Sequence, residues 1–116
     1  MIDHIAKPYI KDGFFGGWAS QMKSISKQEN VYCKMSGMIT EADYNTWTLE
    51  QLNPYMDLIL KVFGSNRIMF GSDWPVCLVA GNYKQVKEIV TNFIVKLSDS
   101  EQRGIMGNNA LNFYNI

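Results

Sequence analysis

The sequence predicts an α/β fold in which three parallel strands are covered by helices. Short apolar runs at Met1–Ile5, Val31–Ser36 and Ile68–Ser72 have the length and residue types of strands. Longer segments with apolar residues at helical spacing lie between and after them. Strands that alternate with helices form parallel βαβ units with right-handed crossovers. The 116 residues are enough for one domain with a hydrophobic core.

Two helices are predicted before the third strand. The first covers residues 14–27, where apolar side chains repeat at helical spacing. A polar and aromatic connection over residues 38–48 leads to the second helix. Asn53 is suited to the N-cap of this helix and Pro54 to its first position. Gly64 is typical of the residue at which such a helix ends.

Two further helices are predicted after the third strand. Residues 83–96 carry apolar side chains at helical spacing. Ser98 and Glu101 have the spacing of a capping box, in which the hydroxyl and the carboxylate each accept from an exposed backbone amide. A last helix is therefore expected from there to about Tyr114.

The composition is that of a globular protein, with 47% hydrophobic and 19% charged residues. Eleven basic residues balance eleven acidic ones, so nothing in the charge favours a nucleic-acid partner. No apolar stretch has the length of a membrane span, so no membrane partner is expected. Cys33 and Cys77 form no Cys-x-x-Cys pair, and reduced thiols in the cytoplasm are the expected state.

The most informative residue is Asp73, which follows the third apolar run and precedes Trp74 and Pro75. Pro75 lacks a backbone donor and biases Trp74 away from a helix, so the strand must stop here. Asp73 is thus expected at the carboxyl end of a strand, where parallel α/β sheets place ligands and chemistry. The alternative interpretation is a turn residue or a helix cap.

Two other polar side chains are expected at the same end of the sheet. His4, the single histidine, stands where a proline breaks the first predicted strand. Lys34 shares a strand face with Ser36, whereas the more apolar face carrying Cys33 should meet the helices. His4, Lys34 and Asp73 can therefore converge. The alternatives are a histidine satisfied by nearby backbone and a lysine that guards an edge strand.

Five segments in this order resemble the amidohydrolase-related metal-dependent hydrolases, and within them the sugar-lactonase branch of fuconolactonase- and rhamnonolactonase-like enzymes. The resemblance implies the C-terminal βα units of a (β/α)8 TIM barrel. A complete barrel takes about 250 residues, so residues 1–116 are expected to be a C-terminal fragment of the amidohydrolase-related domain. The matching segments are Asp3–Pro8, Cys33–Gly37, Thr40–Ala42, Phe70–Cys77 and Asn109–Tyr114.

The resemblance also implies roles for individual residues. Asp73 corresponds to the family's catalytic base, and His4 is expected beside it as the second catalytic residue. Lys34 and Glu41 are expected to contact substrate oxygens. The remaining two substrate-binding candidates are the flat rings of Trp74 and Trp47, which suit the C–H faces of a sugar. Core packing is the alternative for both tryptophans, and a helix start is the alternative for Glu41.

The predicted function is a hydrolase of carbohydrate metabolism that opens a sugar-acid lactone, a small-molecule cyclic ester. The wider family implies a divalent metal such as zinc in a complete enzyme, but the lactonase branch also resembles metal-independent enzymes. One histidine is too few for a three- or four-ligand zinc site, so no tightly bound metal is expected in this chain alone. The alternatives are a decarboxylase or amide hydrolase on the same scaffold, and an inactive fragment that forms homo-oligomers through exposed sheet edges.

Overall fold

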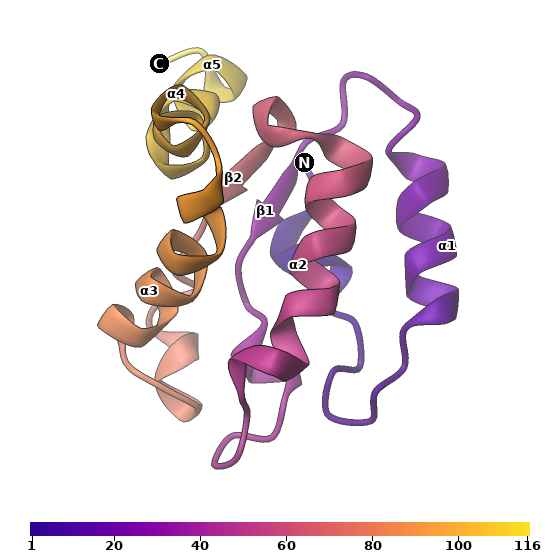
Figure 1. Cartoon of the computed structure of the whole chain (residues 1–116), viewed down its shortest axis with the longest axis vertical. Coiled ribbons are helices and arrows are strands. Elements are labelled where there is room, and N and C mark those ends of the chain that lie inside the picture. Colours follow the sequence, from indigo (N-terminus) through magenta and orange to yellow (C-terminus); the bar gives the residue numbers. More distant parts are fainter.

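A short parallel sheet lies at the centre of the computed structural model, which describes residues 1–116. β1 (Cys33–Met35) pairs with β2 (Ile68–Phe70), with Cys33 opposite Ile68. Parallel strands need a crossover connection, and the long helix α2 (Leu49–Phe63) supplies it. Figure 1 shows α2 in front of the sheet, between α1 (Gly16–Ile25) and α3 (Tyr83–Phe93). The predicted α/β class is therefore confirmed.

The prediction of a full strand at Met1–Ile5 is wrong. Only Ile2 pairs there, through a single parallel bridge to Cys33. The Ile2 amide donates to the Tyr32 carbonyl over 2.8 Å, and the Lys34 amide donates to the Ile2 carbonyl over 2.9 Å. From the fourth residue the backbone turns left-handed, which extended strands cannot do. The sheet has two strands and one bridge rather than three full strands.

The helix α2 begins earlier than predicted, at Leu49 rather than at Pro54. Thr48 is its N-cap: its hydroxyl accepts from the Gln51 amide, and the Gln51 side chain accepts from the Thr48 amide. This capping box outweighs Asn53 and Pro54, which lie inside the helix. The predicted end is confirmed, because Gly64 follows the last helical residue with a φ of +75°.

The C-terminal region is helical but not one continuous helix. The capping box of Ser98 and Glu101 is confirmed and starts α4 (Asp99–Arg103). A π-helical turn separates α4 from α5 (Asn109–Tyr114). The side-chain amide of Asn109, the first residue of α5, donates to the Ser65 and Ile68 carbonyls, each over 2.7 Å, and so ties this region to β2.

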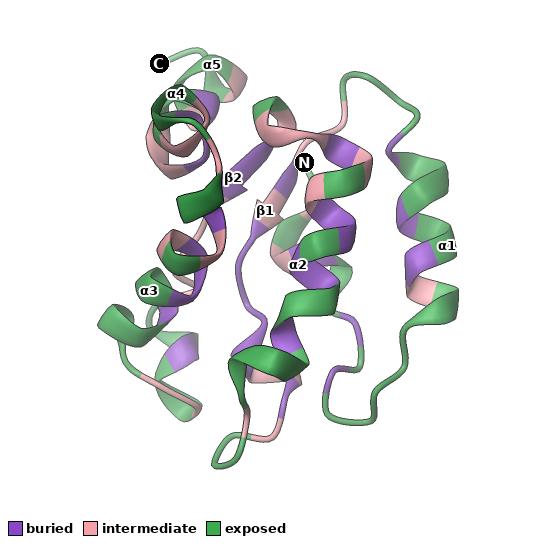
Figure 2. Cartoon of the chain, in the orientation of Figure 1, coloured by how far each residue is buried: buried purple, intermediate pink, exposed green.

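The hydrophobic core lies between the sheet and the helices. In Figure 2 the buried residues follow the inner faces of α2 and α3 and the two strands. Cys33 and Met35 are fully buried, while Lys34 between them is only partly covered, as the predicted alternation of strand faces requires. No helix has both the length and the apolar character needed to cross a membrane. Short 3-10 turns complete the fold at Ile39–Glu41, Ser65–Arg67, Val76–Val79 and Ile94–Lys96.

One arginine closes the end of the sheet where both strands begin. The Arg67 guanidinium donates to carbonyls in the loop before β1 and to carbonyls at the end of α2. A planar guanidinium with five donors suits this clustered set of acceptors. Its acceptors are the carbonyls of Ser26, Gln28, Val31, Val62 and Phe63.

Candidate active site

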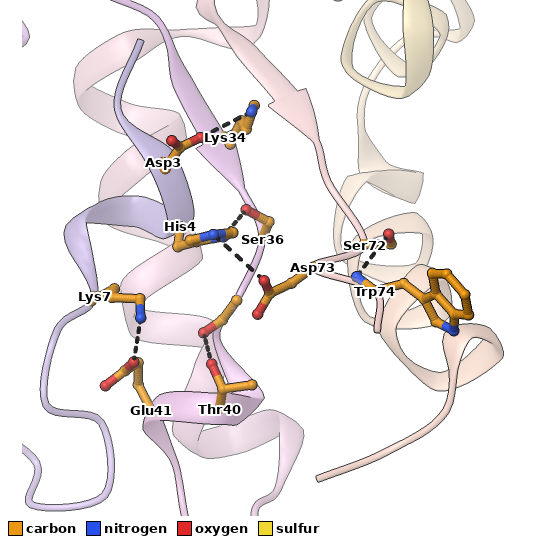
Figure 3. A network of polar contacts seen from close by, with 11 residues as sticks. Asp3, His4, Lys7, Lys34, Ser36, Thr40, Glu41, Ser72, Asp73 and Trp74 are labelled. Carbon is orange, nitrogen blue, oxygen red and sulfur yellow. Dashed lines mark hydrogen bonds and ion pairs between the residues drawn. The ribbon is translucent and has the colours of Figure 1, made fainter. Parts of the chain in front are cut away.

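Three polar side chains from separate segments meet where β1 and β2 end. His4 Nδ1 lies 2.8 Å from Ser36 Oγ, and His4 Nε2 lies 3.5 Å from Asp73 Oδ1. Figure 3 shows the imidazole between the hydroxyl and the carboxylate. The second separation is longer than a good hydrogen bond and lies within the range of an ion pair when the imidazole is protonated. The predicted meeting of His4 and Asp73 is present.

A left-handed turn presents His4 to this site. The φ angles of His4, Ile5, Ala6 and Lys7 are +53°, +47°, +63° and +50°. Residues other than glycine pay about 1–2 kcal/mol each for this conformation. The turn is held by burial of Ile5, by the Trp18 indole donating to the Ile5 carbonyl over 2.7 Å, and by the Lys7 amide donating to the His4 carbonyl. Backbone strain of this kind concentrates at functional sites.

Two glycines give the imidazole and the hydroxyl the space that they occupy. A Cβ at Gly37 would lie 2.8 Å from the Nδ1 atom of His4, and a Cβ at Gly71 would lie 2.9 Å from the Cβ of Ser36. Gly37 also has a φ of +65°, which favours glycine for a second reason. The sequence Ser-Gly after β1 and the Gly after β2 therefore permit the close approach of the three segments.

Asp73 occupies a backbone position that only a few residue types tolerate. Its φ is +55°, in the left-handed region that aspartate enters more readily than most side chains. Its carbonyl accepts from the Cys77 amide over 2.8 Å, which anchors the turn that follows β2. The carboxylate is only 11% exposed. Asp73 is thus a turn residue whose carboxylate also faces His4, and its catalytic role stays a prediction.

Lys34 points into the same end of the sheet but pairs with Asp3 rather than with Asp73. Its Nζ lies 2.9 Å from Asp3 Oδ1 (Figure 3). The hydrogen bond from Lys34 lowers the pKa of Asp3 below its usual value. The same bond, together with the Tyr114 hydroxyl, raises the pKa of Lys34. The Lys34–Asp3 ion pair is therefore separate from the contact between His4 and Asp73.

Glu41 lies one step further along the rim. Its carboxylate is 3.6 Å from Lys7 Nζ (Figure 3). It also lines an open pocket of about 450 Å³. The other lining residues are mostly polar: Tyr9, Lys11, Asp12, Thr40, Ala42, Asp43, Tyr44 and Asn45. Such a surface offers hydrogen-bond partners to a small polar ligand.

The two candidate tryptophans lie in different surroundings. The indole of Trp47 donates to the Ala80 carbonyl over 2.8 Å and packs against the core. Trp74 is exposed, and Figure 3 shows its ring turned away from Asp73. Their predicted role in substrate binding stays a prediction.

Two residues of this site were given no role in the sequence-based prediction. Ser36 shares the inner face of β1 with Lys34, and that alternation was the available signal. Asp3 precedes His4 directly, but its ion pair with Lys34 depends on the turn at residues 3–6, which no local sequence pattern predicts. Long-range contacts of this kind are set by the fold rather than by spacing in the sequence.

A zinc ion would not find a complete ligand set here. Zinc sites use three or four protein ligands, and no group of three histidine, cysteine, aspartate or glutamate side chains comes together in this chain. His4 and Asp73 are two potential donors, and Nδ1 of His4 is already bonded to Ser36. No step of the chemistry below is therefore assigned to a metal.

Comparison with known proteins defines the class. The amidohydrolase family model matches residues 1–116, and the chain belongs to this family. It is 33% identical to an L-fucono-1,5-lactonase of Burkholderia multivorans over 98% of this chain and 42% of that enzyme. An L-fucono-1,5-lactonase of Burkholderia ambifaria is 33% identical over 100% of this chain and 41% of that enzyme. The chain thus spans about two fifths of the length of these relatives.

A solved structure agrees with this assignment. An amidohydrolase of Burkholderia multivorans, crystallised with bound zinc, superimposes with a TM-score of 0.94 and 34% identity. The superposition covers 98% of this chain and 43% of that one. The arrangement of strands and helices described above is therefore part of a larger amidohydrolase architecture in that relative.

Proposed function

We propose that this chain forms the C-terminal βα units of a TIM-barrel enzyme that hydrolyses sugar-acid lactones. The observation that carries the proposal is the meeting of His4 and Asp73, 3.5 Å apart, at the carboxyl end of the sheet. This is the end at which barrel enzymes place their catalytic residues. The relatives of this chain that act on L-fucono-1,5-lactone make a cyclic sugar ester the favoured substrate class.

In the proposed reaction Asp73 acts as general base. Its carboxylate takes a proton from a water molecule as the water oxygen attacks the lactone carbonyl carbon. The ring C–O bond of the tetrahedral intermediate then breaks, and the proton passes to the leaving ring oxygen. The product is an open-chain hydroxy acid, so water is consumed and no other reactant is required.

His4 or Lys34 is proposed to stabilise the negative charge that develops on the carbonyl oxygen. One such donor contributes about 3 kcal/mol to transition-state stabilisation. The pocket beside Glu41 is proposed to receive the sugar hydroxyls, because hydroxyl groups pair with the carboxylates, amides and phenols that line it. Neither Trp47 nor Trp74 lines this pocket, so the role of their rings in substrate binding stays a prediction.

The decisive experiment compares wild type with Asp73→Asn in hydrolysis of aldonolactones, followed by the release of acid. Loss of a general base is expected to lower kcat by about 10²- to 10⁴-fold. Asp57→Asn is the matched control, because it makes the same chemical change on the outer face of α2, where Asp57 pairs with Lys96. Equal activity of wild type and Asp73→Asn would refute the role of Asp73.

A second candidate function rests on exposed apolar surface after Asp73. Four large side chains in the turn 74–79 are more than half exposed: Trp74, Val76, Leu78 and Val79. Exposed apolar groups and open sheet edges favour association, so the chain alone is proposed to form homo-oligomers. A lack of activity in every variant, combined with a mass that rises with concentration, would favour this inactive, assembling unit over the enzyme.

A further inference from the structure

The hydroxyl of Ser36 has a single partner, the Nδ1 atom of His4. The two atoms are 2.8 Å apart, and Ser36 is only 1% exposed. A buried hydroxyl requires a hydrogen bond, and water does not reach this one. A hydroxyl can either donate or accept, so the direction of this bond depends on where the imidazole carries its proton.

The other side of the ring decides that question. Nε2 of His4 faces Asp73, whose carboxylate only accepts hydrogen bonds. A neutral imidazole has one N–H, and this proton is most stable on the nitrogen that faces the carboxylate. Nδ1 is then left with a lone pair, and Ser36 must donate to it.

We propose that Ser36 is a positioning residue which, with Asp73 on the other side of the ring, holds His4 as the Nε2–H tautomer, with this N–H directed at Asp73. Ser36 makes no contact with the reacting atoms and acts only through His4. The inference deepens the proposed function, on which its catalytic meaning rests, because an N–H held toward Asp73 orients the carboxylate that is proposed to act as the base.

The backbone around Ser36 and His4 is shaped to bring their side chains together. Gly37 leaves no side chain between β1 and the ring, and Gly71 lets Ser36 approach β2. A larger residue at either position would collide with the histidine or the serine at less than 3 Å. The left-handed turn at His4 fixes the ring from the other side. Three independent features of the backbone thus converge on one hydrogen bond.

The test uses the fact that the chain has one histidine, so every imidazole signal belongs to His4. The ¹⁵N-labelled chain is studied by long-range ¹H–¹⁵N correlation at about pH 8.5, where an ordinary imidazole is neutral. We expect the wild type to show the proton on Nε2 and an Nδ1 resonance displaced by the hydrogen bond that it accepts. A proton on Nδ1 in the wild type would overturn the inference without any variant.

Two variants complete the test. In Ser36→Ala we expect the displacement of the Nδ1 resonance to be lost and the two tautomers to mix. Ser72→Ala is the matched control, because the Ser72 hydroxyl lies on the same rim but accepts from the Trp74 amide, not from the ring. An unchanged Nδ1 resonance in Ser36→Ala also contradicts the inference. These signals do not depend on turnover, so a failure of the lactonase proposal is distinguishable from a failure of this one.

Discussion

The two ends of the small sheet are built on opposite principles. Where the strands begin, the Arg67 guanidinium donates to five backbone carbonyls, so the hydrogen-bonding groups around it are satisfied. Where the strands end, Asp73 and four residues from His4 to Lys7 hold left-handed backbones, and charged side chains stand in pairs. The comparison teaches that one end of the sheet contributes stability, whereas at the other end strained backbone places polar groups at a cost in stability.

The largest effect on stability is expected at the first of these ends. Arg67→Ala should lower the free energy of unfolding by about 3 kcal/mol, because several carbonyls lose a charged donor. Urea denaturation measures this change. Lys61→Ala on the exposed face of α2 is the control and should stay within about 0.5 kcal/mol of wild type. An Arg67→Ala chain as stable as this control would show that the guanidinium is not an anchor.

At the opposite end, Gly37→Ala should cost about 1–3 kcal/mol and displace the imidazole. The added methyl would meet the ring of His4 at 2.8 Å. Gly13→Ala separates the two causes, because Gly13 has a similar φ of +72° but open space around its Cβ position. A smaller loss in Gly13→Ala, measured by thermal unfolding, isolates the collision with His4. Equal losses would leave backbone conformation as the whole effect.

Substitutions at the start of α2 test whether the capping box of Thr48 contributes to stability without any charged group. Thr48→Ala should lower stability by about 1 kcal/mol, the usual value of an N-cap. Asn53→Ala should change little, since Asn53 lies inside the helix and is exposed. A larger loss of unfolding free energy in Asn53→Ala than in Thr48→Ala, measured by chemical denaturation, would indicate that Asn53 is the N-cap after all.

The smallest effect is expected from the ion pair of Asp3 and Lys34. Because the folded-state pKa of Asp3 is lowered, its contribution is present above the unfolded value of 3.8 and is lost as pH falls through the folded pKa. Asp3 is largely exposed, so screening by salt keeps the contribution small. Asp3→Asn should therefore make the free energy of unfolding fall slightly less steeply at acidic pH, and 1 M salt should abolish the difference from wild type. The same pH dependence in both proteins would mean that the ion pair contributes nothing to stability.

Features governed by neighbouring residues were predictable from the sequence. The capping box at Ser98, the end of α2 at Gly64 and the inward face of Lys34 all depend on residues within one turn or on strand alternation. The start of α2 was wrong because two local signals competed, and the box at Thr48 outweighed Asn53.

The rim could be predicted only in part. The meeting of His4 and Asp73 followed from parallel strand order, and the structure has it. The left-handed turn at residues 4–7 could not be foreseen, because buried Ile5 and the distant Trp18 indole hold it. The partner of Lys34 depends on that turn and was missed for the same reason.

The connection from β1 to α2 is anchored near its end by the hydrogen bond from the Trp47 indole to the Ala80 carbonyl. The middle of this connection lines the polar pocket beside Glu41. Exposed positions such as Tyr44 and Asn45 can therefore be substituted without displacing the imidazole or the carboxylate. Under the proposed function, substitutions in this loop would change which sugar the pocket accepts while leaving His4 and Asp73 in place.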